Sequence, residues 1–184
     1  MAMRHWPLAA ALSLAAMLGL PAAASEGSRA VERDYVTAPL APASQSAEAA
    51  ARKSAGCLSC HEETDAPTMH DNPAVKLGCV DCHGGDHEVF LPSGVGREDR
   101  GYVETMEQAH VLPTYPEDWH YPHSANPERS YTLLNREAPE YIRFVNPSDY
   151  RIAEEACGAC HMDIIRASVR SLHSTGAMLW GGAA

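Results

Sequence analysis

The sequence predicts a mostly α-helical chain with extensive loops and almost no sheet. Two segments predict helices: an alanine-rich run at residues 47–56, and a stretch that begins at Ser148 or Asp149, either of which can cap a helix. Prolines divide the segment between them into turns and short helices, because proline lacks the N–H that helix interiors and central strands require. These prolines are Pro92, Pro113, Pro116, Pro122, Pro127, Pro139 and Pro147.

The N-terminal residues have the features of a secretory signal peptide. Arg4 supplies a positive charge, residues 8–20 form a short apolar run, and residues 21–25 offer small side chains for cleavage. The apolar run is shorter than the roughly 20 residues that a helix needs to span a bilayer, so an uncleaved anchor is the weaker interpretation. Residues 1–24 are therefore predicted to be removed on export, which leaves a periplasmic or extracellular chain without a membrane span.

The rest of the chain is predicted to form a linker and one domain. Residues 25–46 are rich in alanine, proline and serine, which predicts a flexible linker, and residues 47–184 form the domain. Within it, residues 99–110 are predicted to form a short helix ended by Pro113. The stretch from residue 148 to 172 is predicted to be one continuous helix.

The chain is acidic, with 24 Asp and Glu against 14 Lys and Arg and a formal net charge of −10. Removal of residues 1–24 takes away one base, Arg4, and no acid. This balance argues against nucleic acid and anionic lipid as partners. It favours protein partners with basic or locally complementary docking faces.

All six cysteines belong to three copies of one pentapeptide, Cys-x-x-Cys-His, and none is left over. The two cysteines of a copy share one face of a helical turn, so both thiols can form thioethers with the vinyl groups at one porphyrin edge. The histidine that follows can then bind the iron as its proximal ligand. Each motif therefore predicts one covalently attached haem c. The first, second and third motifs are Cys57-Leu58-Ser59-Cys60-His61, Cys79-Val80-Asp81-Cys82-His83 and Cys157-Gly158-Ala159-Cys160-His161.

Other uses of paired cysteines fit this pattern less well. Six cysteines in an exported chain can form three disulfides, but the spacing argues otherwise. Structural zinc sites combine two half-sites, and three half-sites leave one unpaired. A dithiol redox motif also uses Cys-x-x-Cys, but three copies each followed by histidine, with no βαβ pattern around them, disfavour it.

Each low-spin haem iron needs a sixth ligand, and the chain offers an excess of histidine for this role. Histidine at both axial positions gives a low potential, whereas methionine raises it, so the excess favours bis-histidine haems of low potential. The candidate histidines are His70, His87, His110, His120, His123 and His173, and the candidate methionines are Met69, Met106, Met162 and Met178.

Three of these histidines are preferred as iron ligands. His70 lies midway between the first two motifs, which predicts that it serves the first or second haem. His110 ends the predicted short helix. His173 follows His161 by 12 residues, about 18 Å along a continuous helix, so it would serve a different haem. The less favoured histidines are interpreted as surface or propionate-contacting imidazoles, and they are His87, His120 and His123. Met162 is interpreted as packing against a ring.

Protein side chains alone predict a poor core. Hydrophobic residues make up 45% of the chain, but much of that is alanine and signal peptide, and Phe occurs only 2 times. Aromatic residues between the second and third motifs offer area to pack against porphyrins or each other. Three porphyrins would supply the missing apolar mass, so haem attachment is expected to be coupled to folding and the apo chain to be largely unfolded.

Residues 130–135 (SYTLLN), residues 140–147 (EYIRFVNP) and the third motif together resemble a segment of the large multihaem cytochromes of anaerobic, metal-respiring bacteria. The resemblance covers roughly residues 56–184. It implies periplasmic or extracellular electron transfer, three haem sites at the motifs, and His110 as a distal ligand. Because those proteins are longer and residues 177–184 form an apolar end, the sequence is expected to be a truncated part of a longer chain.

Three functions are compatible with these motifs. The leading hypothesis is electron transfer between redox proteins such as other cytochromes, quinol-linked donors, acceptor proteins or extracellular oxidants. A reductase of a small inorganic oxidant would need one open haem site. The lysine-ended motif that marks the active haem of ammonia-forming nitrite reductases is absent. In a cytochrome filament, His173 or His123 would complete a haem on the next copy of the chain.

Overall fold

The computed structural model describes residues 28–61, 69–121 and 124–176. The predicted signal peptide, His123, Met178 and the apolar end therefore lie outside the described residues. The described part is helical and looped, and its only strand pairing is an isolated bridge between Trp119 and Pro127, so the predicted class is confirmed at this level. The helices are α1 (Ala47–Arg52), α2 (Ala55–Leu58), α3 (Cys79–His83), α4 (Arg100–Ala109), η2 (Pro116–Asp118), η3 (Tyr131–Arg136), α5 (Pro139–Val145), α6 (Ala153–Ala156), α7 (Gly158–Val169) and α8 (Leu172–Thr175).

The alanine-rich run forms two short helices rather than one. The Ser46 side chain accepts a hydrogen bond from Ala49 N (3.1 Å) and so begins α1. A turn at Lys53 and Ser54 (φ −119°, ψ −11° at Ser54) separates α1 from α2, which leads into the first motif. By contrast, α4 matches the helix predicted at residues 99–110, and an Arg100–Glu104 ion pair (2.8 Å) joins neighbouring turns of it.

The prediction of one continuous helix from residue 148 to 172 is wrong. Cys157 (φ −127°, ψ −15°) separates α6 from α7, and His161 (φ −119°, ψ 18°) kinks α7. After α7 the chain turns, and the Ser171 side chain accepts from Ser174 N (3.4 Å) to begin α8. Helix propensity is a weak preference, and local hydrogen bonding overrides it here at the third motif and at a serine cap.

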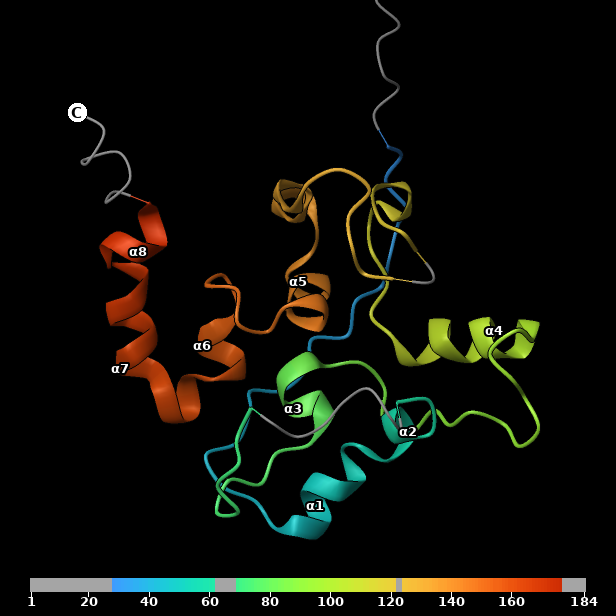
Figure 1. Cartoon of the computed structure of the whole chain (residues 1–184), viewed down its shortest axis with the longest axis horizontal. Coiled ribbons are helices and arrows are strands. Elements are labelled where there is room, and N and C mark those ends of the chain that lie inside the picture. The colour runs from blue at the N-terminus through green and yellow to red at the C-terminus, as the bar shows by residue number, and fades with distance from the viewer. Residues whose placement is uncertain (1–27, 62–68, 122–123, 177–184) are drawn as a thin grey trace, which may run out of the picture.

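Residues 28–46, predicted as part of a flexible linker, lie extended along the rest of the molecule and hydrogen-bond to it. Val31 N donates to Thr114 O (2.8 Å), the Tyr35 hydroxyl donates to Leu112 O (2.9 Å), and Ala41 N donates to Glu155 O (3.1 Å). Ala41 is buried. The blue segment of Figure 1 follows this path past α5 and α3 to α1. This segment is therefore part of the fold, which differs from the sequence-based expectation.

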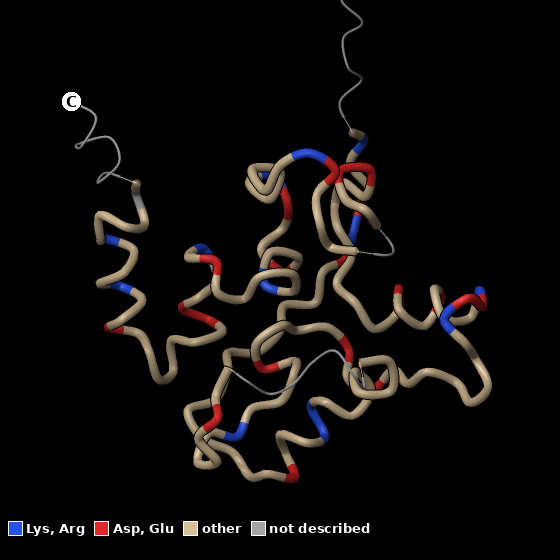
Figure 2. The backbone as a smooth tube through the Cα atoms, in the orientation of Figure 1, with Lys and Arg blue, Asp and Glu red and all other residues tan. Residues whose placement is uncertain are grey.

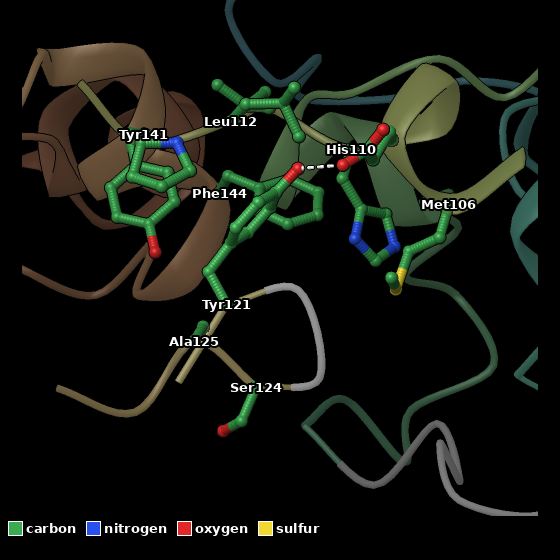
Figure 3. Close-up of a pocket in the computed structure, with 11 residues that line it drawn as sticks. Met106, His110, Leu112, Tyr121, Ser124, Ala125, Tyr141 and Phe144 are labelled. Atoms are coloured by element: carbon green, nitrogen blue, oxygen red, sulfur yellow. Dashed lines mark hydrogen bonds between the residues drawn. The ribbon is translucent and has the colours of Figure 1, made fainter. Parts of the chain in front are cut away.

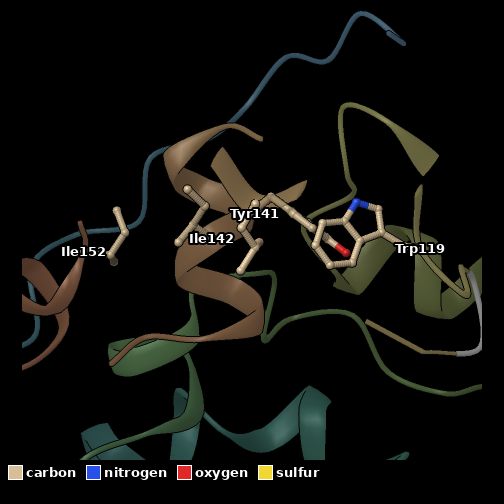
Figure 4. Packing of buried hydrophobic residues seen from close by; sticks show 5 residues of the cluster. Trp119, Tyr141, Ile142 and Ile152 are labelled. Atoms are coloured by element: carbon tan, nitrogen blue, oxygen red, sulfur yellow. The ribbon is translucent and has the colours of Figure 1, made fainter. Parts of the chain in front are cut away.

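The buried hydrophobic core is small and centred on α5 and the loops around it. It consists of Trp119, Leu134, Tyr141, Ile142 and Ile152, four of which are labelled in Figure 4. The Trp119 and Tyr141 rings meet edge to face at 5.3 Å. Many other large apolar side chains are exposed, which agrees with the prediction of a poor protein core. They include Leu58, Met69, Phe90, Ile164 and Leu172.

The buried carboxylate of Glu137 closes one side of this core. It accepts hydrogen bonds from Thr114 N (2.6 Å), Tyr115 N (3.1 Å) and the Trp119 indole (2.8 Å). Because a buried carboxylate is costly unless it is hydrogen-bonded, these donors fix the loop before η2 against the end of η3.

The helices on either side of α3 and α5 extend outward in opposite directions. Figure 1 shows α4 on one side and α7 with α8 on the other. Within the described ranges, none of the helices has both the length and the apolar character needed to cross a bilayer.

Candidate haem-binding site

Each Cys-x-x-Cys-His motif folds as a helical turn, as haem attachment requires. In the first and third motifs the histidine N–H donates to the carbonyl of the first cysteine, at 3.0 Å in both. The second motif is helix α3 itself. All six cysteines are free thiols, so no disulfide uses them. Both sulfurs of each motif thus lie on one short turn.

The first and second motifs are in direct contact. Cys79 N donates to the Ser54 hydroxyl (3.0 Å), just before α2. A hydrogen bond between the two thiols raises the pKa of Cys57 and lowers that of Cys79. Lys53 reaches the buried Asp81 carboxylate of the second motif at 2.5 Å. These contacts hold two attachment sites side by side.

The second and third motifs are also neighbours. Helix α3 packs against α5 and α6, and α6 leads directly into the third motif. Burial raises the pKa of the Cys82 thiol, and the nearby Cys157 raises it further. The three motifs therefore form a row in chain order, with the second motif in the middle.

His110 lies opposite His61 of the first motif. Their ring centres are 6.2 Å apart, with an interplanar angle of 38°. Two iron–nitrogen bonds of about 2.0 Å and a ring radius of about 1.1 Å on each side place the ring centres of two axial imidazoles about 6 Å apart. The observed distance between ring centres matches the one expected if both imidazoles bound one iron.

The position of His110 depends on a close approach between the end of α4 and the loop after the second motif. Asp86 N donates to Ala109 O (2.8 Å), and a Cβ at Gly85 (φ 81°) would lie 2.7 Å from that same oxygen. Only glycine fits this position without strain. Burial, and then the charge of His61, lower the pKa of His110 to about 4, which keeps its ring neutral and its lone pair available to a metal.

His70 lies opposite His161 of the third motif. Their ring centres are 6.3 Å apart and nearly parallel, with an interplanar angle of 17°. This spacing again matches two imidazoles on one iron. The short chain on either side of His70 led to the expectation that it serves the first or second motif. The structure brings it to the third motif instead.

His83 of the second motif is held by α5. Its Nδ1 lies 2.7 Å from the Phe144 carbonyl oxygen, so an Nδ1–H would donate there and leave Nε2 for a metal. The Phe144 ring meets the His83 ring edge to face at 6.5 Å and the His110 ring at 4.8 Å. Among the described residues, no second imidazole pairs with the His83 ring.

The remaining candidate ligands lie elsewhere. His173 is exposed on α8, and no imidazole of the described residues pairs with it. His120 Nδ1 lies 2.8 Å from a Glu128 carboxylate oxygen, and His87 is half-buried with its carbonyl accepting from Gly56 N (2.9 Å). Met162 folds against Gly158 of the third motif, which is a packing contact.

An apolar pocket lies beside His110. Figure 3 shows His110 and Met106 next to the rings of Tyr121 and Phe144. The Tyr121 hydroxyl donates to Glu107 (2.5 Å), and burial together with that carboxylate raises its pKa to about 12. Apolar and aromatic walls of this kind suit the face or edge of a porphyrin.

Two residues of this site gave no usable signal in the sequence. Arg143 is buried and donates to the main chain of the second motif, and Phe144 contacts His83 and His110. Both lie within residues 140–147, but an arginine in an amphipathic helix is normally exposed to solvent, so nothing in the sequence indicated that Arg143 would be buried. Their roles depend on tertiary placement.

Comparison of the chain with protein-family models, curated proteins and solved structures found no match. Within the described residues, no group of three or more His, Cys, Asp or Glu side chains gathers closely enough to hold a bare metal ion. The donors do fit haem, because the porphyrin supplies four nitrogens and the chain needs to supply only axial ligands and thiols.

Proposed function

We propose that this chain is a c-type cytochrome that carries three covalently attached haems and transfers electrons between redox proteins outside the cytoplasm. The observation that supports it best is the spacing of two imidazole pairs, each made from the histidine of a motif and a second histidine. The pairs are His61 with His110 and His70 with His161. The motif cysteines provide the thioether links, and His83 is the proximal ligand at the second motif.

The residues perform three tasks in this proposal. The motif thiols would fix each haem covalently, the paired imidazoles would bind its iron, and α5 orients His83 through the Phe144 carbonyl. Haem iron supplies reversible one-electron exchange when bound. Contacts between successive motifs keep the attachment points close, which favours electron exchange along the row.

The surface is compatible with protein partners. Figure 2 shows acidic and basic residues spread over the elements, and the chain as a whole has a net charge of −10. Haem propionates would add negative charge. We therefore propose that the partners are redox proteins with basic docking faces, met in the periplasm or outside the cell.

Mass spectrometry of the full chain tests this proposal. The protein is produced in a host competent for cytochrome c maturation, and the processed protein is expected to exceed its polypeptide mass by three haems. Replacing both cysteines of one motif by serine should remove one haem, whereas serine at one exposed residue such as Thr132 should remove none. A processed protein of bare polypeptide mass would refute the proposal.

The second candidate function is reduction of a small inorganic oxidant at the second haem. The observation that favours it is that, among the described residues, no second imidazole lies opposite the His83 ring. Carbon monoxide binding to the reduced holoprotein at neutral pH separates the two functions. Rapid binding by one haem would favour the reductase, and no binding would favour a pure electron carrier.

A further inference from the structure

A buried arginine lies at the main chain of the second motif. Arg143 is only 2% exposed. Its Nε donates to Cys82 O (3.1 Å) and its Nη2 to Asp81 O (2.8 Å), both within the motif. The other guanidinium bonds go to Ala38 O (2.9 Å) and Pro39 O (2.8 Å) in the extended N-terminal segment. All four acceptors are neutral carbonyls, so they fix the charge in place without cancelling it.

The acidic groups nearby only partly balance this charge. Glu155 lies 3.6 Å from Arg143, but its side chain is 43% exposed and so is screened by water. The Asp81 carboxylate points to Lys53, which already pairs with it at 2.5 Å. A buried cation is therefore fixed on the backbone of the second motif, at the carbonyls of Asp81 and Cys82.

We propose that Arg143 raises the reduction potential of the haem attached at the second motif, an inference that rests on the proposed function. Reduction adds one electron from a protein donor to the haem, so a fixed cation beside the attachment site favours the reduced state. The second motif is the middle of the row, so electrons would collect at this haem between the first and third.

Charge-removing and charge-conserving variants test the proposal. Each midpoint potential is measured by redox titration of the full holoprotein, with the haems distinguished by the NMR signals of their methyl groups. Arg143→Gln is expected to shift the reduction equilibrium of the second haem about tenfold toward the oxidised state. For a one-electron couple this lowers the midpoint potential by about 59 mV. Arg143→Lys keeps the charge and should shift it less. Arg151→Gln removes a charge that Asp149 already pairs (2.7 Å) and serves as the matched control.

Glu155→Gln provides a test of opposite sign that does not depend on the fold of the Arg143 variants. Neutralising this half-exposed carboxylate should raise the midpoint of the second haem, because it removes the anion closest to Arg143. An unchanged or lowered midpoint potential in Glu155→Gln, or equal shifts in Arg143→Gln and Arg143→Lys, would overturn the inference. If three haems were still attached, the proposed function would not be affected. A chain without covalent haem would overturn both.

Discussion

The two imidazole pairs take their second histidine from different parts of the chain. His110 follows α4 and reaches the first motif from a distance in sequence, whereas His70 follows the first motif and reaches the third. In the proposed holoprotein each pair would therefore tie two separate segments together through one iron. A change at either second histidine should alter one haem and leave the others as they are.

Methionine substitution tests this assignment. In His70→Met and His110→Met, all three haems should remain attached, because the thioether links are untouched. One midpoint potential should rise by at least about 59 mV in each variant, since methionine ligation favours the reduced iron. His120→Met is the control, because its ring pairs with Glu128 rather than with another imidazole. A variant that shifted all three midpoints equally would contradict the pairing.

Phe144 is expected to orient the distal ligand of the first haem. Its ring packs on His110 at 4.8 Å and meets His83 at 6.5 Å, so Phe144→Leu should free the His110 imidazole to rotate and change the electron paramagnetic resonance g-values of the first haem the most. The haem count should not change, because the carbonyl that binds His83 belongs to the backbone. Phe90→Leu makes the same chemical change at an exposed ring and should leave the spectrum unaltered.

The sequence predicts attachment sites but not imidazole pairs. Thioether attachment and proximal ligation depend on five consecutive residues, so the roles of Cys57, His61 and their counterparts follow from the motif spacing alone and stay predictions. The partner of each proximal histidine depends on tertiary placement, which is why His70 was expected near the first two motifs but lies at the third. The burial of Arg143 likewise arises from carbonyls contributed by two distant segments.

At the scale of elements, short helices replace the long one that propensity suggested. Helices α6 and α7 meet at Cys157, and α1 and α2 separate at Ser54, so in both cases the chain bends close to a motif. The helix α4, which carries no motif, matches its prediction closely. Pattern and propensity therefore predicted the fold class well, and failed where the chain bends at or next to a Cys-x-x-Cys-His motif.

The contact between α1 and α3 rests on a buried ion pair. Asp81 accepts from Lys53 and Gln45 (2.5 Å each) and from Gly78 N (2.8 Å). Asp81→Asn should destabilise the holoprotein by about 2 kcal/mol, because it leaves a partly buried ammonium without its anion. Lys53→Met should cost a similar amount.

A double-mutant cycle measured by denaturant unfolding distinguishes this coupling from two independent effects. Because the two groups contact each other, the paired variant should cost clearly less than the sum of the single variants. Asp163→Asn, at an exposed position of α7, is the control and should change stability by less than about 0.5 kcal/mol. Additive costs would show that the ion pair contributes nothing of its own.

At the scale of the whole molecule, one apolar cluster is buried, and other large apolar side chains, some of them in or next to the motifs, are exposed. The cluster of Trp119, Tyr141 and their neighbours is packed by protein alone. Leu58 lies within the first motif and Ile164 one turn beyond His161, and both are exposed. Porphyrins attached at these motifs would cover such residues, so the two regions should differ in how far they depend on haem.

Hydrogen exchange of a variant with all six cysteines changed to serine tests this difference. Without attached haem, amides in α5 and η3 should retain measurable protection, because the buried cluster and the Glu137 hydrogen bonds remain. Amides in α1, α2, α7 and α8 should exchange at rates close to those of an unfolded chain. The holoprotein should protect both regions. Equal protection of α7 with and without haem would contradict a fold whose outer helices depend on porphyrin burial.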